Sequence, residues 1–304
     1  MKVLVAIICR MPSAPSIETI EAVTFWPAWQ EIAEARLFPL FQHETSLGRA
    51  GMNQLFLRHV REWQPDLVFS VAFRNNWESG IMEQVDCPAV VWFSDSYRAD
   101  FVRQQAVKFD IAIVMDDIGE KLLAGHPNVK RSMWACNPGL HCPGTQERDL
   151  DVVFIGGTHG GKESYLQALC DVGLSTAVHG LGRKSGRVAT AEYVNYYQRA
   201  KIGLVFTMSA DGRTPQPKAR MFETPAMGAL LLAQRSPYLD SYLKLGKEYD
   251  DFNSAGELVD KVQYYLEHER ERIAIARAGC KSVRRKHTYI KRLREVVQWV
   301  IESV

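Results

Sequence analysis

A glycine-rich loop at residues 156–162, Gly-Gly-Thr-His-Gly-Gly-Lys, carries the clearest chemical signal in the chain. It follows an apolar run that ends at Ile155 and precedes a helical pattern. Glycines let a backbone approach a phosphate closely, and a helix start offers free N–H groups to it. A plain strand-to-helix turn is the alternative. Because four of the six residues before the lysine are glycines, we favour phosphate binding, with these candidates: Gly156, Gly157, Thr158, His159, Gly160, Gly161 and Lys162.

The same loop comes close to the P-loop of ATPases. Gly156, Gly161 and Lys162 fit its spacing, but the pattern then requires Ser or Thr to hold magnesium, and Glu163 stands there. A carboxylate at this point would repel phosphate oxygens. The sequence therefore favours a phosphate compound in another kind of site, and an ATP-binding protein stays open as an alternative.

A second cluster of polar residues lies in the segment 213–233. Lys218 and Arg220 stand just ahead of Glu223 and Thr224, near the start of a predicted helix. A carboxylate there could accept two ribose hydroxyls, and the cations could meet a diphosphate. Each charge-assisted hydrogen bond of this kind contributes roughly 1.5–3 kcal/mol. The alternative for Glu223 is a helix N-terminal charge favoured by the helix dipole.

The elements that must position these residues alternate between short apolar runs and amphipathic stretches, which is typical of βαβ units. We expect strands at residues 2–9, 66–73, 89–95, 110–117, 129–136, 151–157, 175–180, 201–207 and 229–234. We expect helices at 50–63, 98–109, 162–171, 190–200 and 218–228, one capped by Ser254 and a last one after Thr288. Residues 137–151, rich in Pro, Gly and charge, read as an interdomain linker.

The pattern therefore predicts an α/β protein with two Rossmann-like domains. Ligands of such sheets bind beyond the carboxyl ends of the strands. Asp116 and Asp117 follow one predicted strand and look like a metal pair, but we interpret them as caps of the next helix. Cys136, His141 and Cys142 could also hold a metal, although core or loop positions fit them better.

Composition narrows the class of protein. The chain has 304 residues and a net charge of +2, which is too small to indicate a nucleic-acid or membrane partner. The start, MKVLVAIICR, lacks a cleavage site and reads as a strand, and no segment is apolar enough to span a bilayer. Six cysteines without a Cys-x-x-Cys pair fit a cytoplasmic protein. The basic run at 284–294 is interpreted as a solvated helix face, with contact to a polyanion as the alternative.

The segment 218–233, KARMFETPAMGALLLA, with the residues that follow it to about 298, resembles the C-terminal domain of CgeB-like glycosyltransferases, relatives of the group 1 enzymes with the GT-B fold. The resemblance implies two Rossmann-like domains that face a central cleft, at residues 1–143 and 144–286. A C-terminal helix at 287–304 could pack back on the first domain. It also implies a nucleoside-diphosphate sugar as substrate, bound mainly by the second domain, with no tightly bound cofactor and no metal.

Carried over residue by residue, the resemblance gives Glu223 the donor ribose. It places Arg220 and the loop 156–162 at the diphosphate, and His179 and Gly180 near the base. Many group 1 enzymes have a second glutamate eight positions earlier, which contacts the donor sugar, but Pro215 stands there. The stereochemical outcome therefore stays open, with retention slightly favoured.

The first domain would supply the acceptor side. Asp95 ends a predicted strand. In an inverting enzyme it would be the general base, and in a retaining one it would orient a substrate. The alternative is that Asp95 caps the next helix. On strand-exit loops we expect further acceptor contacts: His43, Arg49, Asn53, Arg74 and Asn75.

We therefore predict a glycosyltransferase that uses a nucleoside-diphosphate sugar, UDP-linked by preference. The acceptor would be a hydroxyl of a surface glycan or a protein, or less commonly a hydroxymethylated base in DNA. The alternatives are the ATP-binding protein and a nucleotide-sugar sensor without catalysis. The sequence does not indicate an oligomeric state.

Overall fold

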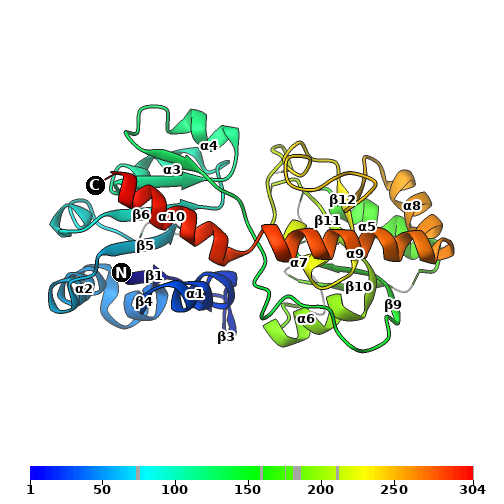
Figure 1. The fold of residues 1–304 in the computed structure, drawn as a ribbon, viewed down its shortest axis with the longest axis horizontal. Coiled ribbons are helices and arrows are strands. Elements are labelled where there is room, and N and C mark those ends of the chain that lie inside the picture. The colour runs from blue at the N-terminus through cyan, green and yellow to red at the C-terminus, as the bar shows by residue number, and fades with distance from the viewer. Residues whose placement is uncertain (73–75, 158–159, 175, 181–185, 210–211, 304) are drawn as a thin grey trace. The chain divides into compact units, whose positions relative to one another are not determined.

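The computed structural model describes residues 1–72, 76–157, 160–174, 176–180, 186–209 and 212–303. The chain forms two compact units (Figure 1). The first contains Met1–Met133 together with Tyr289–Val304, and the second contains Trp134–Thr288. In the described part of the chain, no helix has both the length and the apolar composition needed to cross a membrane.

The first unit is built on a parallel sheet of six strands in the order β4-β1-β5-β6-β7-β8. Its central strands are runs of buried apolar residues, as expected for strands covered on both faces. The register places Val3 opposite both Ala35 and Leu67. The strands are β1 (Lys2–Ile7), β4 (Glu34–Pro39), β5 (Leu67–Ala72), β6 (Ala89–Phe93), β7 (Ile111–Val114) and β8 (Val129–Arg131), and a small antiparallel pair is formed by β2 (Arg10–Met11) and β3 (Ala14–Glu18).

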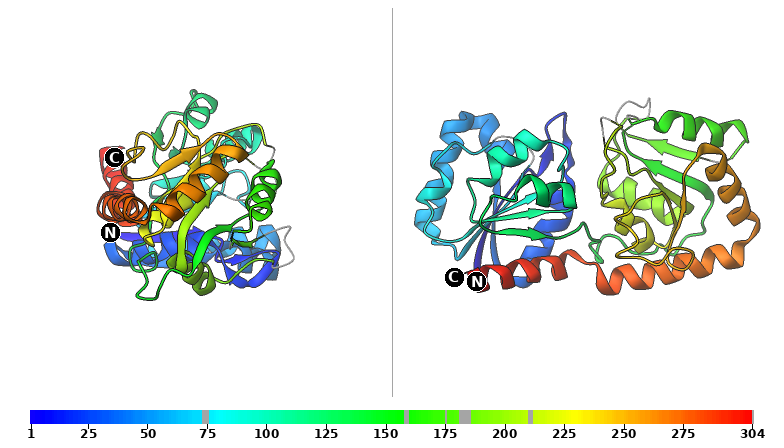
Figure 2. Two further views of the ribbon diagram at one scale, coloured as in Figure 1. Left: turned by 90° about the vertical axis from the view of Figure 1, so that its right-hand side faces the viewer. Right: turned by 90° about the horizontal axis from the view of Figure 1, so that it is seen from above.

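The helices of the first unit include one from the far end of the sequence. That helix, α10, packs on α1, and the ring centroids of Tyr289 and Phe25 lie 4.7 Å apart. Both termini therefore lie on the first unit (Figure 2). The predicted return of the C-terminal helix to the first domain is confirmed. The helices are α1 (Ile20–Ile32), α2 (Leu40–Trp63), α3 (Ala99–Ala106), α4 (Asp117–Leu122) and α10 (Tyr289–Ser303), with a 3₁₀ turn η1 (Met82–Gln84).

The second unit has a parallel sheet of five strands in the order β10-β9-β11-β12-β13. Its strands are β9 (Leu150–Ile155), β10 (Thr176–His179), β11 (Ala200–Val205), β12 (Leu230–Gln234) and β13 (Asp250–Phe252). Its helices are α5 (Lys162–Asp171), α6 (Thr190–Arg199), α7 (Arg220–Ala226), α8 (Ala255–Glu267) and α9 (Glu269–Lys286). Two parallel α/β sheets were the fold class predicted from the sequence, and that prediction is confirmed.

Several helix caps also agree with the sequence. Asp116 caps α4 by accepting a hydrogen bond from the N–H of Gly119 at 2.8 Å, which is the interpretation that we preferred over a metal pair. Ser254 caps α8 by accepting from the N–H of Glu257 at 3.1 Å. The side chain of Glu257 accepts a hydrogen bond from the N–H of Asn253 at 2.8 Å, which also supports the start of this helix.

Candidate functional site

Three neighbouring strands of the second unit end at one edge of the sheet, and the candidate donor residues follow them. Gly156 follows β9, Gly180 follows β10 and Thr207 follows β11. The strands are parallel and adjacent in the order β10-β9-β11, so their carboxyl ends meet. The N–H of Gly156 donates to the carbonyl of His179 at 2.9 Å, which ties the first two loops together.

Two glycines allow these loops to approach one another. Gly180 has φ +130°, and a Cβ atom there would lie 2.3 Å from the carbonyl oxygen of Gly156. Gly160 has φ +79°, and its Cβ would lie 2.9 Å from the carbonyl oxygen of Ser209, in the loop after β11. Side chains at either position would push the loops apart, so the glycine-rich sequence is required by close backbone contact.

Two cations reach the same place from two helix starts. Lys162 is the first residue of α5 and only 6% exposed, whereas Arg220 is the first residue of α7. The Nη2 atom of Arg220 lies 3.1 Å from the position of a Cβ on Gly156, and the Nζ atom of Lys162 lies 3.7 Å from that of a Cβ on Gly160. Burial and the nearby Arg220 lower the pKa of Lys162 to about 8. Like charges held together in a buried place are stabilised by an anion between them.

Arg220 has further capacity for a ligand. Its guanidinium lies 5.8 Å from the ring centre of Phe154, at the end of β9. Its Nε atom is buried and has no hydrogen-bond partner among the described residues. Because a buried donor without a partner is costly, a bound phosphate that reached this atom would gain a strong hydrogen bond.

Glu223 lies one helical turn after Arg220 and is 4% exposed. The hydroxyl of Tyr193 donates to its Oε2 atom at 2.6 Å, and the Nε2 atom of His141 lies 3.9 Å from its Oε1 atom. Burial, and then the charge of Glu223, raise the pKa of Tyr193 well above its usual value, so this phenol keeps its proton. Burial lowers the pKa of His141, so this ring is neutral near pH 7.

The tautomer of His141 follows from its other nitrogen. The N–H of Asn137 donates to Nδ1 at 3.1 Å, so the proton of the neutral ring is on Nε2, which faces Glu223. Tyr193 and His141 together hold the carboxylate in one orientation. Neither residue was assigned to the donor site from the sequence. His141 was considered only as a metal ligand, and residues 137–151, expected to be a linker, pack within the second unit.

The remaining donor candidates lie around this centre or outside the described residues. The ring of His179 lies 4.3 Å from that of Tyr196. Lys218 donates to the side-chain oxygen of Gln216 at 2.7 Å. Thr224 is fully buried with its methyl against Gly203 of β11, which is a core position. Gly157 and Gly161 belong to the loop after β9, whereas Thr158 and His159 lie outside the described residues.

On the first unit, Asp95 follows β6 and is half-buried. Helix α3 begins after Arg98, whose side chain makes no capping hydrogen bond. The carbonyl oxygen of Asp95 accepts from the N–H of Arg98 at 3.1 Å. Its carboxylate stays a candidate for a chemical role.

The predicted acceptor residues lie on a helix rather than on strand-exit loops. His43, Arg49 and Asn53 belong to α2, because β4 ends immediately before it. A glycine at φ +68°, Gly48, interrupts this helix between His43 and Arg49. The ring of His43 lies 4.6 Å from that of Phe38, and burial lowers its pKa. Two other acceptor candidates, Arg74 and Asn75, lie outside the described residues.

Asn53 is a scaffold residue in this structure. It is completely buried, and its Nδ2 atom donates to the carbonyls of Arg49 at 2.7 Å and Asn76 at 3.2 Å. Glu44 joins the same cluster, because its carboxylate accepts from Asn76 at 2.8 Å and lies 3.6 Å from Nε of Arg49. These bonds fix α2 to the segment after β5, and Asn53 has no exposed atoms to offer an acceptor directly.

A metal site would need at least three His, Cys, Asp or Glu side chains that converge on one point. No such group is found among the described residues. Cys136, one of the residues considered for a metal, is buried in the core, and burial raises the pKa of its thiol to about 12. The six cysteines are free thiols.

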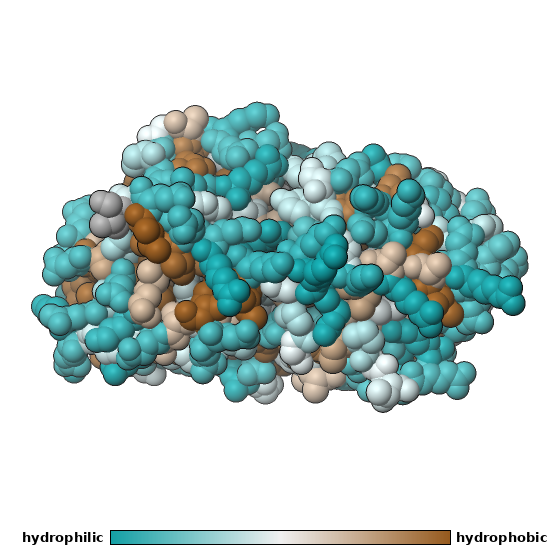
Figure 3. Space-filling view, viewed as in Figure 1, coloured by the Kyte–Doolittle hydropathy of each residue, from teal (hydrophilic) through white to brown (hydrophobic). Residues whose placement is uncertain are grey.

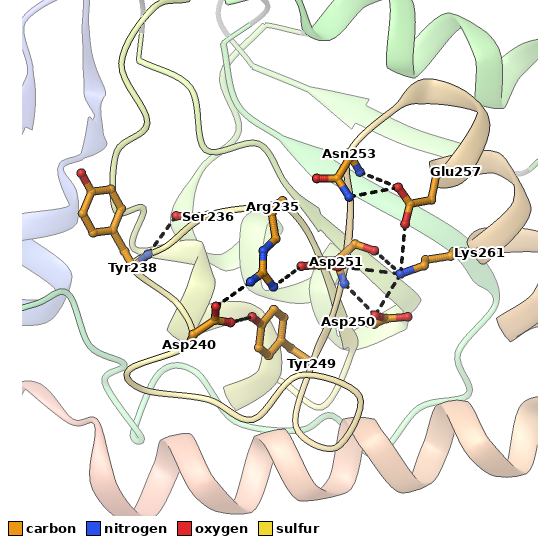
Figure 4. Close-up of polar contacts among 10 residues, drawn as sticks. All are labelled: Arg235, Ser236, Tyr238, Asp240, Tyr249, Asp250, Asp251, Asn253, Glu257 and Lys261. Atoms are coloured by element: carbon orange, nitrogen blue, oxygen red, sulfur yellow. Dashed lines mark hydrogen bonds and ion pairs between the residues drawn. The ribbon is translucent and has the colours of Figure 1, made fainter.

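A second charged cluster of the same unit has a different character (Figure 4). Around β13, Lys261 contacts Asp250 at 3.1 Å and Glu257 at 3.4 Å, and Arg235 contacts Asp251 at 2.7 Å. Each cation in this network faces carboxylates. The network therefore fixes the end of the sheet to α8 and has little charge left for a ligand.

Residues 162–298 match a family described as glycosyl transferase-like. The similarity therefore covers most of the second unit and α10. It includes Lys162, Arg220 and Glu223, and it agrees with the resemblance to CgeB-like enzymes seen in the sequence. No curated protein sequence matches the chain.

Solved structures match the whole chain at low identity. Sucrose-phosphate synthase from Thermosynechococcus elongatus has a TM-score of 0.73 at 10% identity, with 100% of each chain covered. HepE of Anabaena, solved with UDP and glucose, has a TM-score of 0.70 at 12% identity and the same coverage. A DNA-modifying β-glucosyltransferase has a TM-score of 0.63 at 12% identity, with 99% of this chain and 100% of that chain covered. These likenesses show that the chain has the GT-B fold, as predicted.

Proposed function

We propose that the protein is a glycosyltransferase that moves a sugar from a nucleoside-diphosphate sugar, UDP-linked by preference, to an acceptor hydroxyl. The observation that carries this proposal is the pair of cations, Lys162 and Arg220, held against the glycine loops after β9 and β10. The family match of residues 162–298 supports it. So do the fold likeness to HepE, which was solved in complex with UDP-glucose, and the likeness to sucrose-phosphate synthase.

The donor would bind at the carboxyl edge of the second sheet. Lys162, Arg220 and the amides of the loop 156–161 would hold the diphosphate. The ribose hydroxyls would bond to Glu223, whose orientation Tyr193 and His141 already fix. The base would lie near His179 and Gly180. Fixing the carboxylate before the donor arrives reduces the ordering that binding must achieve.

Transfer breaks the bond between the anomeric carbon and the diphosphate oxygen, and forms a bond to the acceptor oxygen. The departing diphosphate gains negative charge, which Lys162 and Arg220 stabilise. The acceptor hydroxyl loses its proton. If transfer inverts the anomeric centre, Asp95 is our candidate base, and if it retains, which we slightly favour, Asp95 orients a substrate.

Pro215 stands where many group 1 enzymes have a glutamate that contacts the donor sugar. Pro215 forms an antiparallel bridge with Met208, shortly after β11. A residue without a side-chain acceptor at this point makes no hydrogen bond to the sugar, and other groups would have to hold it. We propose a metal-independent reaction in the cytoplasm, with a glycan or protein hydroxyl as acceptor and a hydroxymethylated DNA base as the less common one.

The test is a thermal-shift panel of UDP, GDP, TDP, CDP and ATP without metal. It uses the wild-type protein, Glu223→Ala, and Glu267→Ala, which removes an exposed carboxylate at the end of α8 as a control. We expect one diphosphate to stabilise the wild type and the control. Glu223→Ala should bind it about 10- to 100-fold more weakly, because two hydroxyl contacts are lost.

Two other results would support the alternatives. A response to ATP alone, dependent on magnesium and abolished in Lys162→Ala, would indicate an ATP-binding protein and contradict the proposal. Binding of a diphosphate with neither transfer nor hydrolysis of any nucleotide sugar would indicate a sensor. Unchanged nucleotide affinity in Glu223→Ala would show that the ribose site is placed wrongly.

A further inference from the structure

A pocket of about 1130 Å³ lies in the second unit, at the opposite edge of the sheet from the donor loops. Asp149, which immediately precedes β9, lines it, as do Lys201 at the start of β11 and Gly228 just before β12. One long wall is helix α9. Because the donor residues follow the carboxyl ends of β9, β10 and β11, this pocket is a separate place on the same sheet.

The wall formed by α9 is strongly basic. Arg277, Lys281 and Arg285 line the pocket, are exposed, and have no ion pair or hydrogen bond among the described residues. They recur every four residues, so a helix places them about 6 Å apart along its axis. Figure 3 shows strongly hydrophilic side chains over α9 in this unit. We call these three residues the basic stripe.

The other cations of the pocket are held in place by the protein. Arg284 donates to the carbonyls of Pro138 at 3.1 Å and His141 at 2.6 Å, and Arg148 donates to that of Met227 at 2.8 Å. Bonds to neutral carbonyls fix a guanidinium without neutralising it. Arg284 and Arg148 therefore add positive charge to the pocket beyond the three exposed side chains.

Acidic residues near the start of α9 could offset this positive charge. The structure shows how those carboxylates are used. Glu269 pairs with Arg272 at 2.9 Å, and Glu271 accepts from the hydroxyl of Tyr264 at 2.8 Å. Neither forms a recorded bond with the basic stripe, which lies toward the other end of the helix.

We propose that the basic stripe and its pocket bind the phosphodiester backbone of a nucleic acid. Three evenly spaced cations over about 12 Å of helix are too extended for a single phosphate and suit consecutive phosphates. The hollow between α9 and the segment before β9 would take one backbone of a duplex, whereas a membrane surface is flat. The inference does not depend on the donor site, because none of the three residues belongs to it.

The test measures fluorescence anisotropy of a labelled DNA duplex of about 20 base pairs and mixed sequence, with the full chain and without nucleotide sugar. Contact with three phosphates predicts a slope of about −2.7 for log K against log salt, hence about 40-fold weaker binding at roughly 200 than at roughly 50 mM salt. Each of Arg277→Ala, Lys281→Ala and Arg285→Ala should make this slope shallower by about 1.

Matched variants make the result specific. Arg270→Ala removes an exposed cation of α9 that does not line the pocket, and it should leave the slope unchanged. Lys162→Ala, in the donor loops, should also leave it unchanged. The triple variant should lose the salt-dependent binding and keep its melting temperature, because the three side chains are exposed.

A triple variant that binds DNA like the wild type would overturn the proposal. So would a wild type that does not bind the duplex at low salt. Stripe-dependent binding to phosphatidylcholine–phosphatidylserine vesicles, with none to DNA, would overturn it in favour of a membrane. Failure of the nucleotide panel would leave this assay unaffected, since the two use different residues and different ligands.

Discussion

Lys162 and Lys261 lie in the same unit, and their surroundings shift their pKa values in opposite directions. Burial, and then Arg220, lower the pKa of Lys162 to about 8. Burial also acts to lower the pKa of Lys261, but its hydrogen bonds and charge interactions with Asp250 and Glu257 outweigh this and raise it. One lysine stands beside another cation, and the other stands among carboxylates.

We infer from this difference that the charge of Lys162 is available to a ligand, whereas the charge of Lys261 stabilises the fold. The network around Lys261 is complete within the protein, so an added anion would gain little there (Figure 4). The charge of Arg220 instead disfavours the protonated form of Lys162. If the proposed donor diphosphate binds there, its negative charge would offset this repulsion.

The largest expected effect comes from removing each lysine in turn. Lys162→Ala should weaken binding of the donor diphosphate by about 10- to 100-fold, because one charge-assisted contact of roughly 1.5–3 kcal/mol is lost. Lys261→Ala should leave that affinity unchanged. Isothermal titration of both variants checks this, and similar losses in the two would remove the distinction between the clusters.

The close contact of the donor loops gives the next effect. Gly180→Ala places a Cβ atom against the carbonyl of Gly156 and strains a backbone with φ +130°, so the free energy of unfolding should fall by about 1–3 kcal/mol. Gly256→Ala, within α8, meets no atom closer than 4.0 Å and should be neutral or stabilising by up to about 1 kcal/mol. Urea denaturation measures both, and equal stability would show that the loops can separate freely.

The pKa of Lys162 predicts a pH dependence. A diphosphate binds the protonated lysine, so its affinity should fall as pH rises through about 8, by up to about tenfold per unit. In the protein without ligand, rising pH has a favourable effect instead, on the stability of the fold. The unfolded chain keeps this proton up to the ordinary value of 10.5, so the free energy of unfolding should rise between pH 8 and 10.5. Titrations in this range should show both trends in the wild type and neither in Lys162→Met.

The smallest effect is expected in the network. Lys261→Met leaves Asp250, Asp251 and Glu257 to repel one another and should lower the free energy of unfolding by about 1 kcal/mol. The side chain is 27% exposed, so water screens part of this repulsion. Lys244→Met, at an exposed lysine, is the control and should change nothing measurable in thermal unfolding. If Lys261→Met unfolds at the same temperature as the wild type, the network contributes no measurable stability.

Much of this architecture was predictable, because buried parallel strands are apolar runs that stand out in a sequence. The strands that were missed lie at sheet edges. β4, EARLFP, alternates charged and apolar residues, and β13 has only three residues, two of them Asp. Edge strands have one neighbour and half-exposed side chains, so composition alone does not mark them. Missing β4 also placed His43 and Arg49 on a loop instead of a helix.

The candidate site was predictable in its residue types and not in its contacts. Glycines at 156–161, Lys162 and Arg220 indicate phosphate chemistry by themselves. The support of Glu223 does not, because Tyr193 is thirty residues away and His141 lies in a segment whose composition suggests a linker. Contacts over such separations depend on how helices settle on the sheet, which local patterns do not record.

The return of α10 to the first unit has a consequence for synthesis. Tyr289, Leu293, Val296 and Val300 are buried there, so the first unit lacks part of its core until residues 289–300 have left the ribosome. The second unit, continuous in sequence, can fold while the first still waits. A chain that stopped before residue 289 would therefore contain all of the second unit, whereas the first unit, although translated earlier, would lack part of its core.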